Sequence, residues 1–141
     1  MNRITIKQIF ENIDLDKDYL VSGWVRTRRG SKSVAFIMLN DGSTIKDLQI
    51  IVEDKVLLDE VFKKINTGTS ITVVGKLLKS TGKGQALELV AKKITILGLS
   101  DPENYPIQPK KHTLDFLRKN AHLRFRTKTF SSVFRIRHAL S

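Results

Sequence analysis

The sequence predicts a mainly β protein built around a small barrel of five strands. Three observations predict it: five short segments have the composition of strands, turn signals separate them, and one segment with helical spacing lies between the third and the fourth. The chain has 141 residues, the usual length of one domain or of one domain with a tail. A hydrophobic content of 40% is enough for one modest core.

The first three strands are expected in the N-terminal part of the chain. Residues 19–27 alternate imperfectly around Gly23, where we expect a bend or bulge. The apolar residues 33–40 form the second strand, and residues 28–32 (RRGSK) form the turn between the two. A strong turn signal, NDGS, then leads into the third strand over residues 47–52.

A helix and two further strands complete the predicted barrel. Residues 57–65 (LLDEVFKKI) carry apolar side chains at helical spacing. Residues 70–79 and 85–97 form two strands, which the glycine-rich residues 80–84 separate. Five strands with a helix between the third and the fourth form the layout of an OB-fold, a Greek-key barrel whose open end the helix plugs. Other small β-barrels also fit this pattern.

The C-terminal part of the chain has a different character. All three prolines lie in the segment SDPENYPIQPKK, which predicts a stiff, extended linker over residues 99–112. A short helix follows at residues 114–118, and apolar residues recur at helical spacing over residues 130–140. Because this apolar stripe reaches the chain end without a cap, we expect the sequence to be the N-terminal fragment of a longer protein.

Composition favours a nucleic-acid binder and gives no support to an enzyme. Lys and Arg number 25 against 14 acidic residues, so the net charge of +11 favours phosphate-rich partners or, less specifically, an anionic membrane surface. There are no cysteines, no apolar run of membrane-spanning length and no apolar signal core, so we expect a cytoplasmic protein without membrane association. The three histidines form no metal-ligand pattern, and no nucleophile and base are suitably spaced.

Strand alternation gathers base-reading side chains on one face. In the second strand Phe36 lies opposite Ala35, and in the third strand Gln49 lies opposite Leu48. An exposed aromatic ring can stack on a base, while an amide and nearby guanidinium groups bind its edge and the phosphates. The simpler alternative is a buried Phe36, a solvated Gln49 and an arginine cluster that protects a sheet edge.

Several motifs then resemble a known family. GWVRTRR, VAFIMLNDGS, LQIIV, VVGKLLKS and ALELVA are similar to the anticodon-binding OB domain of the class II aminoacyl-tRNA synthetases for Asp, Asn and Lys. The segment YPIQPKKHTLDFLRKNAHLRFRT most resembles the bacterial-type asparaginyl-tRNA synthetases. The resemblance implies an anticodon-binding domain over residues 1–98, a hinge over residues 99–112 and the start of a class II catalytic domain over residues 113–141.

The resemblance also implies roles for individual residues. Phe36 would stack on the central anticodon base, a uridine, and Gln49 and Arg29 would hydrogen-bond it. Glu88 would recognise the first anticodon base, guanine or its queuine derivative. Regular alternation puts Arg29 on the wrong face, so its role requires a bulge that Gly23 or Gly30 could supply. Weaker candidates, for contact with the RNA backbone, are Arg26, Arg28 and Lys83.

The whole protein implied by the resemblance is a cytoplasmic, homodimeric asparagine–tRNA ligase that uses ATP and Mg²⁺. Its catalytic motifs would lie beyond this chain, which is therefore expected to bind the tRNA(Asn) anticodon stem-loop, to hold no cofactor and to be inactive alone. Three alternatives stay open. They are an aspartate-type synthetase domain, a sequence-tolerant single-strand binder, and an interaction module in which the stripe over residues 130–140 docks on a partner chain.

Overall fold

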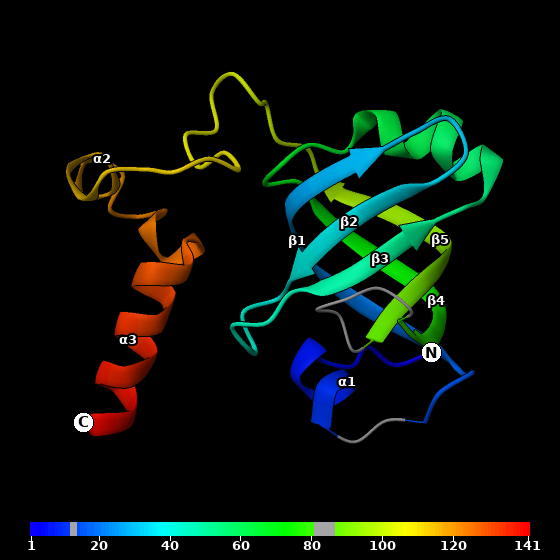
Figure 1. Cartoon of the computed structure of the whole chain (residues 1–141), viewed down its shortest axis with the longest axis horizontal. Helices are drawn as coiled ribbons and strands as arrows, with labels where there is room; N and C mark the ends of the chain where they lie inside the picture. The colour runs from blue at the N-terminus through cyan, green and yellow to red at the C-terminus, as the bar shows by residue number, and fades with distance from the viewer. Residues whose placement is uncertain (12–13, 81–86) are drawn as a thin grey trace.

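The computed structural model describes residues 1–11, 14–80 and 87–141. Among these residues five strands form a closed barrel in the order β1-β2-β3-β5-β4 (Figure 1). β3 and β5 pair in parallel, and the other neighbouring strands are antiparallel. The strands are β1 (Asp18–Gly30), β2 (Ala35–Asn40), β3 (Leu48–Val52), β4 (Ser70–Lys79) and β5 (Leu87–Gly98). The predicted fold class is confirmed.

β1 is longer than the sequence pattern indicated. Arg28 pairs with Ile37 and Arg29 pairs with Phe36, so the prediction of a turn over residues 28–32 was wrong. The turn begins at Ser31, whose N–H donates to the Val34 carbonyl at 2.8 Å. Two consecutive arginines next to a glycine are typical of a turn. Here each guanidinium reaches solvent or an aromatic ring at the barrel surface, so both residues can keep their backbone pairing with β2.

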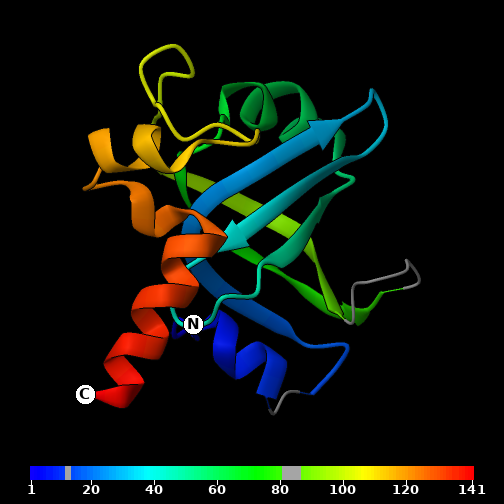
Figure 2. The same cartoon turned by 60° about the vertical axis from the view of Figure 1, so that its left-hand side comes forward.

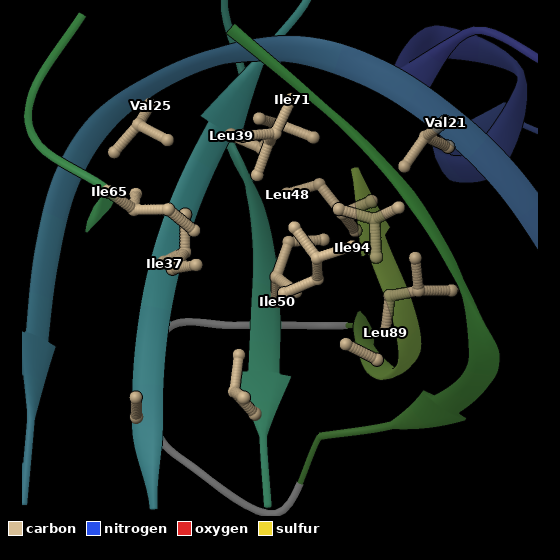
Figure 3. Close-up of a cluster of buried hydrophobic side chains, with 14 of the residues drawn as sticks. Val21, Val25, Ile37, Leu39, Leu48, Ile50, Ile65, Ile71, Leu89 and Ile94 are labelled. Carbon is tan, nitrogen blue, oxygen red and sulfur yellow. The ribbon is translucent and has the colours of Figure 1, made fainter. Parts of the chain in front are cut away.

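The barrel interior holds the hydrophobic core. Figure 3 shows inward-pointing side chains from all five strands, together with Ile65 from the segment that leads into β4. Ile37, Ile50 and Leu89, which stand side by side on β2, β3 and β5, are fully buried. Every second residue of β2 and β3 therefore faces the core, and the intervening side chains lie on the other side of the sheet. Of these, Phe36, Met38 and Gln49 are partly exposed, whereas Ile51, which pairs with Phe36, is buried.

Helical segments close both ends of the barrel (Figures 1 and 2). Between β3 and β4, the turns η1 (Leu57–Val61) and η2 (Phe62–Lys64) bury Leu57, Leu58 and Phe62. This segment is the predicted helix, but it is a π-helical turn followed by a 3₁₀ turn instead of a regular α-helix. This irregular helical geometry directs all three apolar side chains into the end of the barrel.

The opposite end is closed by α1 (Ile6–Glu11), a helix that the sequence pattern did not predict. Thr5 and Gln8 form a capping box: the Gln8 N–H donates to the Thr5 hydroxyl at 3.1 Å, and the Thr5 N–H donates to the Gln8 side-chain oxygen at 2.8 Å. The Ile6 N–H donates to Asp41 at 2.9 Å, so the turn after β2 holds the helix against the barrel. The signal T-x-x-Q was present in the sequence.

The C-terminal segment packs beside the barrel. It turns at residues 101–104 instead of running extended, and Ile107 is buried. The helices α2 (Leu114–Lys119) and α3 (Lys128–Leu140), with the turn η3 (Arg124–Arg126) between them, follow. Arg135 of α3 donates to the Gly42 carbonyl at 2.6 Å, which ties this helix to the turn after β2. Among the described residues no helix is both long enough and apolar enough to span a membrane.

Gly23 lies where β1 leaves β4 and begins to pair with β2. A Cβ added there would be 2.6 Å from the Asn40 carbonyl oxygen, which is backbone and cannot swing away. Gly23→Ala should therefore lower the free energy of unfolding by about 1–3 kcal/mol, as overpacking does. Urea unfolding measures this, with Thr95→Ala on the exposed face of β5 as the control. Equal stabilities of the two variants would contradict the close approach.

Candidate nucleic-acid interface

Four of the predicted site residues share one outer face of the barrel. Side chains of directly paired residues lie on the same side of a sheet. Arg29 pairs with Phe36, and Gln49 pairs with Glu88 across the parallel β3–β5 ladder. Their chain neighbours on β2, β3 and β5 point into the core. We call Arg29, Phe36, Gln49 and Glu88 the Phe36 face.

Phe36 is partly exposed and does not belong to the barrel core. The guanidinium carbon of Arg29 lies 5.1 Å from the centre of the Phe36 ring, within the range of a cation–π contact. The simpler expectation of a buried Phe36 is therefore wrong. A base that stacks on this side of the ring must displace the guanidinium, which would then be free to donate to the base edge or to a phosphate.

Gln49 and Glu88 form the second half of this face. The Gln49 Nε2 donates to Glu88 Oε2 at 3.5 Å, a long hydrogen bond between two partly exposed side chains. The amide supplies both a donor and an acceptor, and the carboxylate supplies acceptors alone. Uridine presents both kinds of group at its edge, and guanine presents adjacent N–H donors, so the pair can satisfy either base.

A β-bulge brings Arg29 to this face. Val25 and Thr27 pair with the consecutive residues Leu39 and Met38, so Arg26 is the extra residue in β1. The extra residue reverses the alternation that follows it, and Arg29 consequently points outward with Phe36. The sequence indicated that a bulge was needed, but it placed the cause at Gly23 or Gly30; the bulge lies at Arg26.

The remaining predicted cations lie apart from the Phe36 face. The Arg28 guanidinium lies 4.1 Å from the centre of the Phe62 ring, at the end of the barrel that η1 and η2 close. Arg26 Nε is 3.9 Å from Asp47 Oδ1, and the two side chains are 23% and 11% exposed. Lys83 lies outside the described residues. Arg26 and Arg28 thus flank the Phe36 face without joining it.

A hollow that the sequence did not predict separates the barrel from the C-terminal segment. Its volume is about 860 Å³, and none of the described residues that line it is acidic. Arg126 lies 4.3 Å above the ring of Trp24, and burial raises the pKa of the nearby Tyr105 hydroxyl, which stays neutral at pH 7. The motif GWVR, with an aromatic residue close to a basic one, could have indicated a binding surface at Trp24. It could not indicate that Arg126 and Tyr105, far along the chain, would lie beside it.

The described residues give no sign of a metal centre. Within residues 1–11, 14–80 and 87–141, no three His, Cys, Asp or Glu side chains gather in a way that could hold an ion. The chemistry of the Phe36 face is that of a recognition surface, with one aromatic ring, one amide, one guanidinium and one carboxylate.

Comparison with known families agrees with this geometry. Residues 19–97, more than half of the chain, match the family described as an OB-fold nucleic acid binding domain. The chain therefore belongs to this family.

Its similarity to individual proteins extends beyond the barrel. It is 46% identical to the asparagine–tRNA ligase of Cytophaga hutchinsonii, with 100% of this chain and 31% of that protein covered. It is 58% identical to the enzyme of the same name from Parabacteroides distasonis, over 86% of this chain and 26% of that protein. The chain thus spans about a third or less of these relatives.

The fold is also found in a solved structure. The asparaginyl-tRNA synthetase from Pyrococcus horikoshii superposes with a TM-score of 0.81 at 21% identity, covering 99% of this chain and 33% of that chain. At this level of identity the likeness concerns the fold. It includes the C-terminal segment as well as the barrel, because nearly the whole chain is covered.

Proposed function

We propose that this chain binds the anticodon stem-loop of tRNA(Asn) as part of an asparagine–tRNA ligase. The observation that carries the proposal is the gathering of Arg29, Phe36, Gln49 and Glu88 on one outer face of the barrel. The net charge of +11 supports it, since RNA binding needs cations for the phosphates. The similarity to asparagine–tRNA ligases along the whole chain supports the choice of tRNA.

Each residue of the Phe36 face has a distinct role in this proposal. The Phe36 ring stacks on the central anticodon uridine, and Gln49 and Arg29 hydrogen-bond its edge. Glu88 accepts hydrogen bonds from the first anticodon base, guanine or its queuine derivative. Contacts with the phosphate backbone at the margin of the face come from Arg26, Arg28 and Lys83.

The proposal for the whole protein is a homodimeric, cytoplasmic ligase. Residues 1–98 form its anticodon-binding domain, residues 99–112 the hinge and residues 113–141 the start of a class II catalytic domain. In the complete catalytic domain, ATP and Mg²⁺ would serve to activate asparagine. The barrel contributes tRNA affinity and discrimination between anticodons.

Fluorescence anisotropy of the full 141-residue chain tests the proposal. The RNAs are the tRNA(Asn) anticodon stem-loop, the same stem-loop with the central uridine changed to cytidine, and an unrelated hairpin of equal length. At one fixed salt concentration, we expect the uridine stem-loop to bind about tenfold more tightly, a difference of about 1.4 kcal/mol. Equal, strongly salt-dependent binding would instead indicate a sequence-tolerant binder, and absence of binding would exclude both.

A further inference from the structure

We infer that Arg26 is a positioning residue: by holding the β-bulge in place, it determines which arginine stands beside Phe36. The inference rests on the proposed function, because the consequence concerns uridine recognition. It gives Arg26 a second role, in addition to the phosphate contact proposed above. The observations are the strand register, the backbone hydrogen bonds of Val25, the ion pair between Arg26 and Asp47 and the contact of Arg28 with the Phe62 ring.

The position of the extra residue determines the direction of every side chain between it and Gly30. With the bulge at Arg26, Arg29 pairs with Phe36 and points outward, while Arg28 pairs with Ile37. With the extra residue three positions later, Arg28 would pair with Phe36, and Thr27 would pair with Ile37. In both arrangements the same side chains of β2 face the core, so core packing alone does not favour one register over the other.

Backbone hydrogen bonds fix the chain just before the bulge. The Val25 N–H donates to the Thr69 carbonyl at 2.9 Å, and the Val25 carbonyl accepts from the Gly68 N–H at 2.7 Å. Both bonds go to the segment that leads into β4, on the side of β1 away from β2. Val25 therefore has the same place in both arrangements, so contacts made by the residues after it must determine where the extra residue lies.

The Arg26 side chain then anchors the extra residue to the start of β3. Its Nε lies 3.9 Å from Asp47 Oδ1. The same Asp47 oxygen accepts from Asn40 Nδ2 at 3.0 Å, and Asn40 pairs with Trp24 on β1. The Asp47 side chain is only 11% exposed, so its attraction to Arg26 is less screened by solvent than that of a surface pair.

A contact on the far side of the bulge favours the same arrangement. Arg28 places its guanidinium 4.1 Å from the centre of the Phe62 ring. In the alternative register Thr27 would take the Arg28 place, and this cation–π contact would be lost. Arg26 and Arg28 thus act together to direct Arg29 to Phe36, although neither belongs to the Phe36 face.

Three variants separate this role from a simple contribution of charge. Arg26→Ala keeps the extra residue but removes its anchor, and Arg26→Lys keeps a cation that can reach Asp47. Deletion of Arg26 makes Val25 and Thr27 consecutive, so regular alternation places Arg29 outward without any bulge. The deletion therefore removes the Arg26 charge while keeping the geometry that the charge is inferred to maintain.

We expect Arg26→Ala to reduce the preference for the uridine stem-loop over the cytidine stem-loop by roughly threefold to tenfold, about the worth of one hydrogen bond. Arg26→Lys should restore most of the preference, and the deletion variant should keep it. NMR gives a second measurement without RNA. Contacts between the Phe36 ring and the Arg29 side chain should persist in the deletion variant and be replaced by contacts with Arg28 in Arg26→Ala.

Two results would overturn the inference. One is unchanged contact between Arg29 and Phe36 in Arg26→Ala. The other is an equal loss of affinity for both stem-loops in Arg26→Ala and in the deletion variant, with the preference for uridine unchanged in both, which indicates that Arg26 acts through contact with phosphate alone. Failure of the proposed function is distinguishable, because the unmodified chain would then show no preference for uridine at all.

Discussion

Replacing Phe36 by alanine is expected to weaken binding of the anticodon stem-loop by roughly 5- to 150-fold. The estimate follows from the worth of base–aromatic stacking, about 1–3 kcal/mol per base. Phe36 lies on the outside of the barrel, so its loss should leave the core and the fold intact. The change also removes the ring that holds the Arg29 guanidinium in the free protein. Anisotropy titration measures the affinity, and urea unfolding verifies that the fold is retained.

The chain offers a control at the other end of the barrel, a ring that packs against the edge of the core, so the fold of the control variant is verified by urea unfolding as well. Phe10 of α1 has the Nζ of Lys46 5.3 Å from its ring centre, so it is also an aromatic side chain beside a cation. Phe10→Ala should leave RNA affinity unchanged, and Phe36→Tyr should retain most of it because a ring remains. An equal loss of affinity in Phe10→Ala and Phe36→Ala would show that the Phe36 ring has no special place in binding.

Ile50→Ala is expected to have the largest effect on stability, about 2–5 kcal/mol, as for other large-to-small changes in a core. Ile50 is fully buried at the centre of β3, between Ile37 on β2 and Leu89 on β5. The cavity cannot collapse easily, because strands of a closed barrel are held on both sides. Urea unfolding followed by circular dichroism measures the change.

The adjacent residue provides the contrast. Gln49 points outward, and its one long hydrogen bond joins it to Glu88. Gln49→Ala should change stability by no more than about 0.5 kcal/mol, as surface substitutions usually do. It should instead reduce the preference for the central uridine. Similar effects of Ile50→Ala and Gln49→Ala on unfolding would contradict the assignment of inner and outer faces.

Much of the barrel was predictable because its strands alternate. β4 has the predicted bounds, and its buried and partly exposed residues alternate over most of its length. Alternation in β2 and β3 likewise predicts that Phe36 and Gln49 point outward. It did not reveal that β3 and β5 are parallel neighbours, and hence that Gln49 and Glu88 meet, because strand pairing depends on the closure of the whole barrel.

The features that sequence reasoning missed depend on distant partners. The bulge at Arg26 lies where β1 changes from pairing with β4 to pairing with β2, and no local feature of the sequence indicates it. The extension of β1 over Arg28 and Arg29 depends likewise on β2. α1 is the exception, since the residues of its capping box are a local signal within the sequence itself. The roles of the site residues in RNA binding stay predictions.

Photochemical crosslinking tests the central proposal most directly. A 5-iodouridine placed at the central anticodon position of the tRNA(Asn) stem-loop crosslinks, on irradiation, to an aromatic side chain stacked on it. Mass spectrometry of the digested complex then identifies the residue. We predict a crosslink to Phe36 that is absent when the label lies in the stem. A crosslink to Trp24 or Tyr105 instead would place the anticodon in the hollow beside the C-terminal segment and contradict the proposal.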